Sequence, residues 1–543
     1  MDTRTIIAIG LFILVYFYFF APQPQQMPQQ VASSTVSDET KPGKEASSKL
    51  EASPEAISPE LENKIFELES ERLRLRINAL GQVIYAELPH YSEKVGQPEP
   101  VRWNFEEVDY FNEVKLNTSL GPVRWKLVSS DSNSIKLEAR IEALILNREI
   151  SLSDSSYSLN IRDSVHNTGK RSAKISQEVR LFKHVDPDKE VGFFKRMFQP
   201  QADILEFVWF QDGSLNTQLT QKLTEPTAVD QAISWGGYSS KYFFLGIIPK
   251  SASFDKLVYS MQNQKASESW ELMEKQIEPN GSDEYETSLY LGPKKIEELK
   301  KLAPDLDHVI QYGNWLGPIS RFLLSILLFF YSLIPNYGIA IIMLTIVVKS
   351  FLFPLAYKGA VSMKKLQIVQ PKMKEIRDKY KSNPQRMQAE MMNLYKTEKV
   401  NPVGGCLPLL LQMPVFFALY RVFFASFEMR HAAFFGWIQD LSAFDPYFVT
   451  PIVMTGVMFL QQKITPMPGG MGEETEAIKV QKAMYKWMPI IFGGIMLFLP
   501  AGLALYILVN ALISVVQQFY LNKHLQKLFP EVKKPALSQV NGH

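Results

Sequence analysis

Residues 344–357 read LTIVVKSFLFPLAY, an apolar segment interrupted by one ammonium group, that of Lys349. Placing that charge in the centre of a bilayer costs about 2.5–3.5 kcal/mol on insertion scales. Lys349 lies eight residues before Tyr357, where the apolar segment ends, which is roughly 12 Å along a helix. A lysine side chain spans only part of that distance, so snorkelling alone does not bring it to bulk water. If this segment crosses a membrane, Lys349 therefore needs a carboxylate partner or local water.

The rest of the carboxy-terminal half shows that the segment is one of several apolar stretches. We expect membrane spans at 338–357, 403–427, 447–465, 486–499 and 502–521. No Asp or Glu lies inside them, and Glu428, directly after the second of them, borders the outer face. Water in a cavity open to the cytoplasm is therefore the better explanation for Lys349.

The amino terminus predicts a sixth span. Residues 5–21 carry no charge and end in an aromatic run, which is typical of a membrane interface. A cleaved signal peptide is the alternative, but it would have a shorter apolar region ending in small residues. We expect an uncleaved anchor at 1–21, followed by a Pro-, Gln- and Ser-rich flexible linker at 22–59.

Residues 60–310 have a different pattern, with apolar and polar residues alternating in short runs separated by turn residues. The runs at 72–77 and 135–141 alternate, and a third run has its apolar residues on one face, at Tyr157, Leu159, Ile161 and Val165. Period-two alternation with intervening turns predicts a large all-β sandwich. The fold class is therefore α + β, with a helical membrane bundle beside a β domain.

The segment 358–399 carries eleven Lys or Arg residues against four acids, a net charge of +7. Two helical patterns within it are separated at 382–384, before a proline, which predicts a helical hairpin. Positive loops stay in the cytoplasm, so we place Arg4, this hairpin and the basic tail (522–543) inside and the β domain outside. The hairpin is either simply a solvated, topogenic loop or a surface for anionic headgroups or ribosomal RNA.

Residues 316–335 form a further apolar stretch, whose uncharged core from Phe322 is only 13 residues long. A core of that length more often lies in the interface or packs on protein than spans. If this stretch spanned the membrane and the amino terminus stayed in the cytoplasm, the +7 segment 358–399 would lie outside. The sequence thus predicts six spans, with both termini in the cytoplasm, residues 22–337 on the other side of the membrane, and 316–335 not spanning.

Polar residues in the other spans are candidates to line a wet groove around Lys349. Thr345 lies one helical turn before it, and one side of the last span carries a polar stripe of Asn510, Ser514, Gln517 and Gln518. Methionines add adaptable apolar surface, which suits varied substrates. Ordinary hydrogen bonding between helices is the alternative for each polar residue. The remaining candidates are Gln412, Met413 and Gln461.

The chain has no nucleotide-binding loop, HExxH zinc motif or GxSxG elbow, so the sequence predicts no enzyme, no cofactor and no metal. Its single cysteine, Cys406, excludes an internal disulfide and is expected to be small, buried and inert. The net charge of +2 argues neither for nor against a nucleic-acid partner, and we expect no DNA binding.

Four stretches resemble the signature of the YidC-type membrane protein insertases: EKVNPVGGCLPLLLQMPVFFALY (398–420), QRMQAEMMNLYK (385–396), WIQDLSAFDPYFVTPI (437–452) and FLPAGLALYILVN (498–510). The anchor, linker and large β domain resemble the Gram-negative form, in which that domain is a periplasmic supersandwich. The resemblance therefore implies that residues 22–337 lie in the periplasm and that 316–335 is an interfacial helix on that side. The resemblance covers the whole hydrophobic half and is weaker in the β domain.

The resemblance implies that the five helices of 338–521 form a hydrophilic groove, open to cytoplasm and lipid and closed on the periplasmic side. The family's groove charge, usually arginine, corresponds to Lys349, and Thr345 matches a substrate-contact position. Lys in place of Arg keeps the charge but loses the planar fork. Ile507 stands where many relatives have a second tyrosine after the one that matches Tyr506, so that contact is in doubt.

The implied function is to insert and fold inner-membrane proteins, alone or with the Sec translocon. Expected partners are nascent membrane proteins, the translocon, the phospholipid bilayer and the ribosome. Contacts of the cytoplasmic loop are expected at Lys364, Lys365, Lys372, Lys374 and Arg377. One alternative is a secondary transporter that uses Lys349 as a substrate or proton site, although the chain has no internal repeat. Another is a periplasmic glycan-binding domain held by a membrane stalk.

Overall fold

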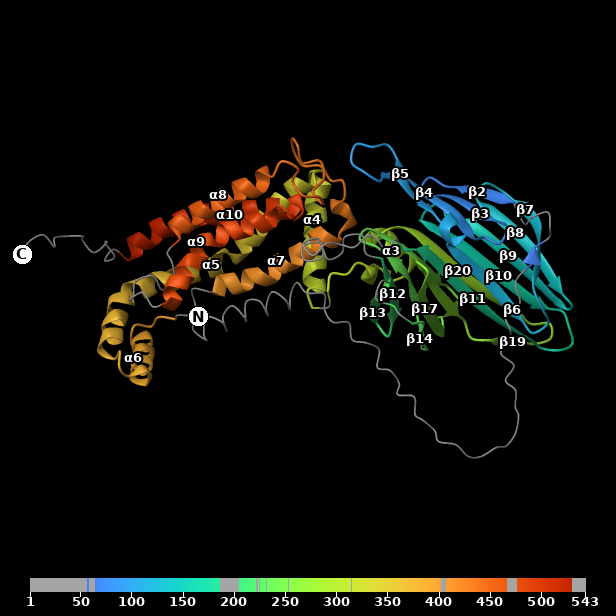
Figure 1. The fold of residues 1–543 in the computed structure, drawn as a ribbon, viewed down its shortest axis with the longest axis horizontal. Coiled ribbons are helices and arrows are strands. Elements are labelled where there is room, and N and C mark those ends of the chain that lie inside the picture. The colour runs from blue at the N-terminus through green and yellow to red at the C-terminus, as the bar shows by residue number, and fades with distance from the viewer. Residues whose placement is uncertain are drawn as a thin grey trace, which may run out of the picture. The chain divides into compact units, whose positions relative to one another are not determined.

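The computed structural model describes residues 56–57, 64–185, 205–401, 407–465 and 476–529, apart from positions 221, 222, 224, 231, 252 and 314. The predicted anchor (1–21), nearly all of the linker (22–59), Cys406 and the end of the tail lie outside these residues. The described residues fall into two compact units, a β unit that ends at Ile310 and a helical unit that begins at Gln311 (Figure 1).

The β unit contains three sheets. The largest has ten strands in the order β1 (Ala56–Ile57), β7 (Arg124–Ser130), β8 (Ser134–Ile141), β9 (Leu144–Leu152), β10 (Ser158–Asn167), β20 (Ser282–Pro293), β16 (Phe243–Pro249), β15 (Trp235–Ser239), β12 (Glu206–Gln211) and β13 (Ser214–Leu219). The second contains β14 (Thr227–Val229), β17 (Lys256–Gln262), β18 (Lys265–Glu271), β11 (Ala173–His184), β19 (Lys275–Ile277) and β6 (Asn112–Thr118). The third has the order β2 (Ile65–Glu69), β3 (Arg74–Asn78), β4 (Val83–Ser92) and β5 (Pro100–Asn104).

Alternation explains why these segments form strands with one buried face. On β10, Leu159, Ile161 and Val165 are buried while Arg162 between them is exposed. Tyr238 of β15 ties two sheets together, because its hydroxyl lies 3.0 Å from both the Leu181 carbonyl oxygen of β11 and that of Ala266. The predicted large β-sandwich is confirmed.

A buried ion pair lies inside this core. Arg148 and Asp163 face each other across β9 and β10, and both side chains are fully buried. The guanidinium group donates to both carboxylate oxygens, at 2.7 and 3.0 Å, and lies over the ring of Trp125. Gln177 of β11 donates a further bond to Asp163 at 3.2 Å. The pair is therefore satisfied by a bidentate contact, a neighbouring amide and an aromatic face.

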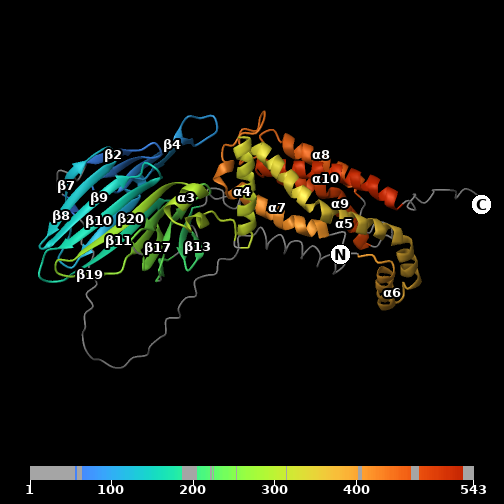
Figure 2. The same ribbon diagram turned by 180° about the vertical axis from the view of Figure 1, so that it is seen from behind.

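Three short helical segments complete the β unit: η1 (Glu106–Val108), α3 (Ile296–Leu302) and η3 (Leu306–Val309). The helical unit contains α4 (Gly317–Leu333), α5 (Tyr337–Lys379), α6 (Pro384–Thr397), α7 (Leu407–Ala425), η4 (Phe427–Met429), α8 (Val449–Ile464), α9 (Glu476–Met496) and α10 (Ala501–Leu528). Seen from both sides, α4 lies at a steep angle to α5, and α6 lies at the far end of α5 (Figures 1 and 2). α10 packs against α5, α7 and α8.

Two of these helices, α5 and α10, are long and apolar enough to cross a membrane. α5 differs from expectation because it continues without interruption from the predicted span into the hairpin and ends only at Lys379. The hairpin turns before Pro384, where Asn383 caps the start of α6 by accepting from the Arg386 amide. α9 begins at Glu476, ten residues before the predicted start of the span at 486. Hydropathy did not include its first turns because they are polar.

Candidate functional site

A polar cluster of five side chains joins three helices of the helical unit. Lys349 comes from α5, Gln412 from α7, and Tyr506, Asn510 and Ser514 from α10. The Lys349 ammonium nitrogen donates to Ser514 Oγ at 2.8 Å. Gln412 Nε2 lies 3.1 Å from the Tyr506 hydroxyl and 3.2 Å from Asn510 Oδ1, to which it donates. Side chains from segments about 160 residues apart thus form one polar seam inside apolar helices.

The spacing along α10 explains how one helix supplies three members. Tyr506, Asn510 and Ser514 recur every four residues, so they lie above one another on one face. Tyr506 is buried, and it lies near the end of α10 that is predicted to face the periplasm. Asn510 and Ser514 are half-buried. The Ser514 hydroxyl donates to the Asn510 carbonyl oxygen at 2.7 Å, which leaves its lone pairs for Lys349.

Lys349 is half-buried and forms no ion pair with a carboxylate among the described residues. An ammonium group has three N–H donors, and the bond to Ser514 uses one. A cation in this setting can attract an acidic group or ordered water, because no carboxylate of the part of the chain that the structure describes pairs with it.

The other candidates take no part in the hydrogen bonds of this cluster given above. Thr345 is buried, and its hydroxyl donates to the Ile341 carbonyl oxygen of its own helix. Met413, Gln461 and Gln517 are half-buried on α7, α8 and α10. The geometry thus links Lys349 to Ser514 directly and to Gln412 through α10, whereas it assigns Thr345 a bond within α5.

A second polar group lies near the other end of α10, where the sequence analysis included Gln518 in the polar stripe but missed its partner Asn522. Gln518 Nε2 donates to Asn522 Oδ1 at 2.8 Å, and Asn522 Nδ2 donates to the Ile464 carbonyl oxygen at the end of α8. The four-residue spacing of Gln518 and Asn522 was the available signal. This group satisfies a carbonyl that the helix end leaves open, so it holds α8 and α10 together.

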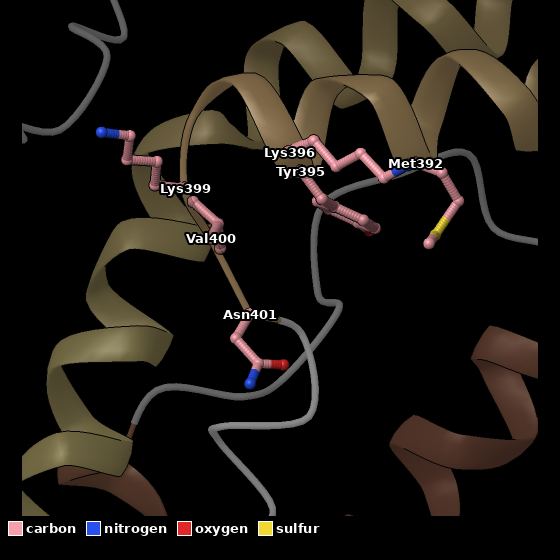
Figure 3. A pocket seen from close by; sticks show the side chains of 6 residues that line it. All are labelled: Met392, Tyr395, Lys396, Lys399, Val400 and Asn401. Carbon is pink, nitrogen blue, oxygen red and sulfur yellow. The ribbon is translucent and has the colours of Figure 1, made fainter.

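The predicted cytoplasmic contacts lie on the polar extension of α5. Lys372 and Lys374 are exposed, and Lys364, Lys365 and Arg377 are half-buried. Lys372 forms an ion pair of 2.6 Å with Glu398 at the end of α6, which closes the hairpin. A hollow of about 310 Å³ lies beside this closure (Figure 3). It is lined by Met392, Tyr395, Lys396, Lys399, Val400 and Asn401.

Among the described residues, no group of three or more His, Cys, Asp or Glu side chains is placed to hold a metal ion. The chemistry available at the polar cluster is therefore that of a cation, an amide and hydroxyl groups.

Comparison with known proteins adds independent findings. A family model described as the 60Kd inner membrane protein matches residues 329–528, and one described as the YidC periplasmic domain matches residues 66–326. The membrane protein insertase YidC of Geotalea daltonii is 31% identical over 97% of this chain and 100% of its own length. That of Syntrophus aciditrophicus is 40% identical over 64% of this chain and 62% of its own length. A crystal structure described as an active YidC insertase with its first transmembrane domain resolved aligns with 96% of this chain and 100% of its own, at 17% identity and a TM-score of 0.35.

Proposed function

The chain belongs to the YidC family of membrane protein insertases, and we propose that it moves polar segments of its substrates through a hydrated groove lined by the polar cluster. It is an inner-membrane protein with a periplasmic domain, and it is an insertase and not an enzyme. The observation that carries the proposal is the Lys349 ammonium group, which is bonded to a neutral hydroxyl within an apolar bundle.

The physical basis of the proposal is the length of the apolar path. A charged residue of a substrate pays about 2.5–3.5 kcal/mol to reach the centre of a bilayer. A cation with free donors halfway across, together with water, shortens the path over which an acidic segment lacks polar partners. Gln412 and Asn510 extend the polar surface beyond Lys349. The apolar span of the substrate moves along the apolar, lipid-facing side of the groove.

The proposed topology has six spans, with both termini in the cytoplasm and residues 22–337 in the periplasm. Support comes from the +7 charge of 358–399, which lies on α6 and the polar extension of α5. α4 is the proposed interfacial helix. It buries Leu323, Leu324 and Leu327 on one side and exposes Phe322 and Phe329 on the other, as a helix between protein and lipid would.

Membrane proteins are the substrates of an insertase, and the proposed further partners are the Sec translocon, the ribosome and the lipid surface. The hairpin lysines favour an anionic partner, because Lys372 and Lys374 expose positive charge on the polar extension of α5. Replacing Lys364, Lys365 and Lys374 by Glu is expected to reduce co-sedimentation with ribosomes. Unchanged binding would leave the hairpin a topogenic loop only.

The test of the groove reverses its charge. Lys349→Glu is expected to block insertion of a small test protein with an acidic periplasmic tail into proteoliposomes, measured by protection of the tail from protease. Lys349→Arg is the matched control and is expected to preserve insertion, because it keeps the charge. Equal insertion by the Glu variant would refute the role of the cation. Solute uptake by the same vesicles without insertion would favour the transporter alternative.

A further inference from the structure

The segment between α7 and α8 is a built structure, although it contains little regular secondary structure. The carboxylate of Asp445 is buried and organises its second half. It accepts hydrogen bonds from the indole N–H of Trp437 at 3.0 Å, from the Tyr447 amide at 3.0 Å and from the Thr450 amide at 2.7 Å. The Thr450 amide is one of the open donors at the start of α8, so Asp445 also caps that helix.

A second aspartate organises the first half. Asp440 Oδ1 accepts from the His431 amide at 3.1 Å and from both the amide and the hydroxyl of Ser442, at 2.8 and 2.7 Å. Both aspartates of the segment therefore accept hydrogen bonds from donors of the segment itself or of the first turn of α8. Turn geometry fixed in this way does not depend on solvent.

The segment is also tied to the starts of two other helices. The carbonyl oxygens of Leu441 and Ala443 accept from the amides of Gly502 and Ala501, at 2.9 and 2.7 Å, at the start of α10. Asn336, which caps α5, donates through Nδ2 to the Phe434 carbonyl oxygen at 3.2 Å. One segment thus caps or bridges the starts of α5, α8 and α10 and fixes them at a common level.

The large exposed apolar side chains of this segment are aromatic. Five large side chains are exposed, among them Phe435 at 61% and Tyr447 at 69%. We call the set the aromatic platform: Phe435, Trp437, Phe444, Tyr447 and Phe448. From Ala432 to Phe448 the sequence has no charged residue other than the two inward-bonded aspartates. Exposed apolar side chains gathered on one short segment in this way mark an interaction site.

The apolar surface continues along α8. Phe448 directly precedes this helix, whose first turn exposes Ile452 at 64% together with Val453. In a membrane protein, an apolar helix side without a protein partner faces lipid, and the platform extends that side beyond the helix end. Trp and Tyr, with amphipathic rings, are enriched where acyl chains meet headgroups.

We infer that the aromatic platform lies in the lipid interface of the periplasmic leaflet and thereby sets the depth of Lys349 in the bilayer. The leaflet rests on the topology proposed above. Lys349 follows the start of α5 by twelve residues, which is roughly 18 Å along a helix. Half of the hydrocarbon thickness is about 15 Å. A platform fixed to the start of α5 and held at the interface therefore places the ammonium group near the bilayer centre.

The test uses the full chain with Cys406→Ser, so that a single introduced cysteine carries a fluorescent or nitroxide label. Labels at Phe435→Cys and Tyr447→Cys, in liposomes, are expected to be quenched by nitroxides attached near the headgroup and to be several-fold less accessible to an aqueous quencher than a label at Gln439→Cys. Gln439 is the matched control, because it is exposed on the same segment and polar. Variants are compared only where insertion of the test protein is retained.

Two results would overturn this inference and leave the proposed function standing, provided that the variants still insert the test protein. One is aqueous accessibility at 435 and 447 equal to that at 439, and the other is shielding from both lipid and water, which would indicate a protein partner. Quenching restricted to lipids of the cytoplasmic leaflet would overturn the inference together with the proposed topology.

Discussion

The ammonium group of Lys349 donates a hydrogen bond of 2.8 Å to Ser514 and thereby joins α5 to α10. Ser514 in turn donates to the backbone of Asn510, so its hydroxyl is oriented before the lysine binds. The cation is consequently held in one place, whereas an unsupported lysine side chain would sample many rotamers.

We therefore predict that Ser514→Ala lowers insertion of a substrate with an acidic tail by roughly three- to tenfold, since bonds to charged groups contribute more than neutral ones. The loss is smaller than for Lys349→Glu because the charge remains. Ser514→Thr keeps the hydroxyl and is the control. An equal loss for a substrate with a neutral tail would show that Ser514 serves helix packing instead.

Gly338 and Phe434 provide a prediction on stability. A Cβ atom built on Gly338 would overlap the ring of Phe434. Gly338→Ala is expected to destabilise the helical unit by about 1–3 kcal/mol, as overpacking does. Thermal unfolding in detergent measures the effect, with Gly494→Ala as the control, because a Cβ at Gly494 meets nothing within 4 Å. Adding Phe434→Leu should restore part of the loss; no restoration would place the strain elsewhere.

Glu268 of β18 predicts a pH dependence of the β unit. The side chain is buried, and desolvation raises its pKa well above the ordinary value, although the indole N–H of Trp270 donates to it at 3.1 Å and opposes the shift. An unfolded glutamate titrates near pH 4.3. Above that pH the folded state binds more protons than the unfolded state, so stability falls as the pH rises, by about 1.4 kcal/mol per unit up to the folded pKa.

Glu268→Gln removes this titration and keeps an oxygen for Trp270. The variant is expected to be more stable than the natural chain at pH 7 and nearly equal to it at pH 4. Hydrogen exchange of the β17 and β18 amides in the full chain reports the difference at each pH. A variant that is less stable at pH 7 would contradict the assignment of a buried, protonated carboxyl group.

The Arg148–Asp163 pair should behave as a unit. Asp163→Asn leaves a buried guanidinium group without its counter-charge, which typically costs about 3–5 kcal/mol. Faster exchange of the β9 and β10 amides is the measurement. The double variant Arg148→Met with Asp163→Leu is expected to recover most of the loss, because it removes both buried charges; a double variant as unstable as the single one would argue against charge as the cause.

The sequence predicted the β-sandwich because alternation is a local signal, as the burial of Leu159, Ile161 and Val165 illustrates. It did not predict that β10 pairs with β20, more than a hundred residues later, because strand pairing is not encoded locally. Buried polar residues such as Arg148 also gave no signal, since their partners lie on other strands.

In the helical unit, hydropathy located the apolar segments but not the helix ends. α9 begins ten residues before the predicted span and α5 continues past its own, because polar residues extend a helix as readily as apolar ones. For the candidate site, the residue types were predictable and the bonds were not. Gln412 and Asn510 were both candidates, but their contact depends on how α7 packs against α10.

The continuity of α5 has a mechanical consequence. Its 43 residues form a rod roughly 65 Å long, with the cation near one third of its length and the hairpin at its end. Pro354 and Pro371 lack the backbone N–H of an ordinary helical residue, so bending concentrates at these two points. A force on the cytoplasmic end of α5 therefore displaces the helix near Lys349. The bending stiffness of α5 at Pro354 and Pro371 determines the size of that displacement.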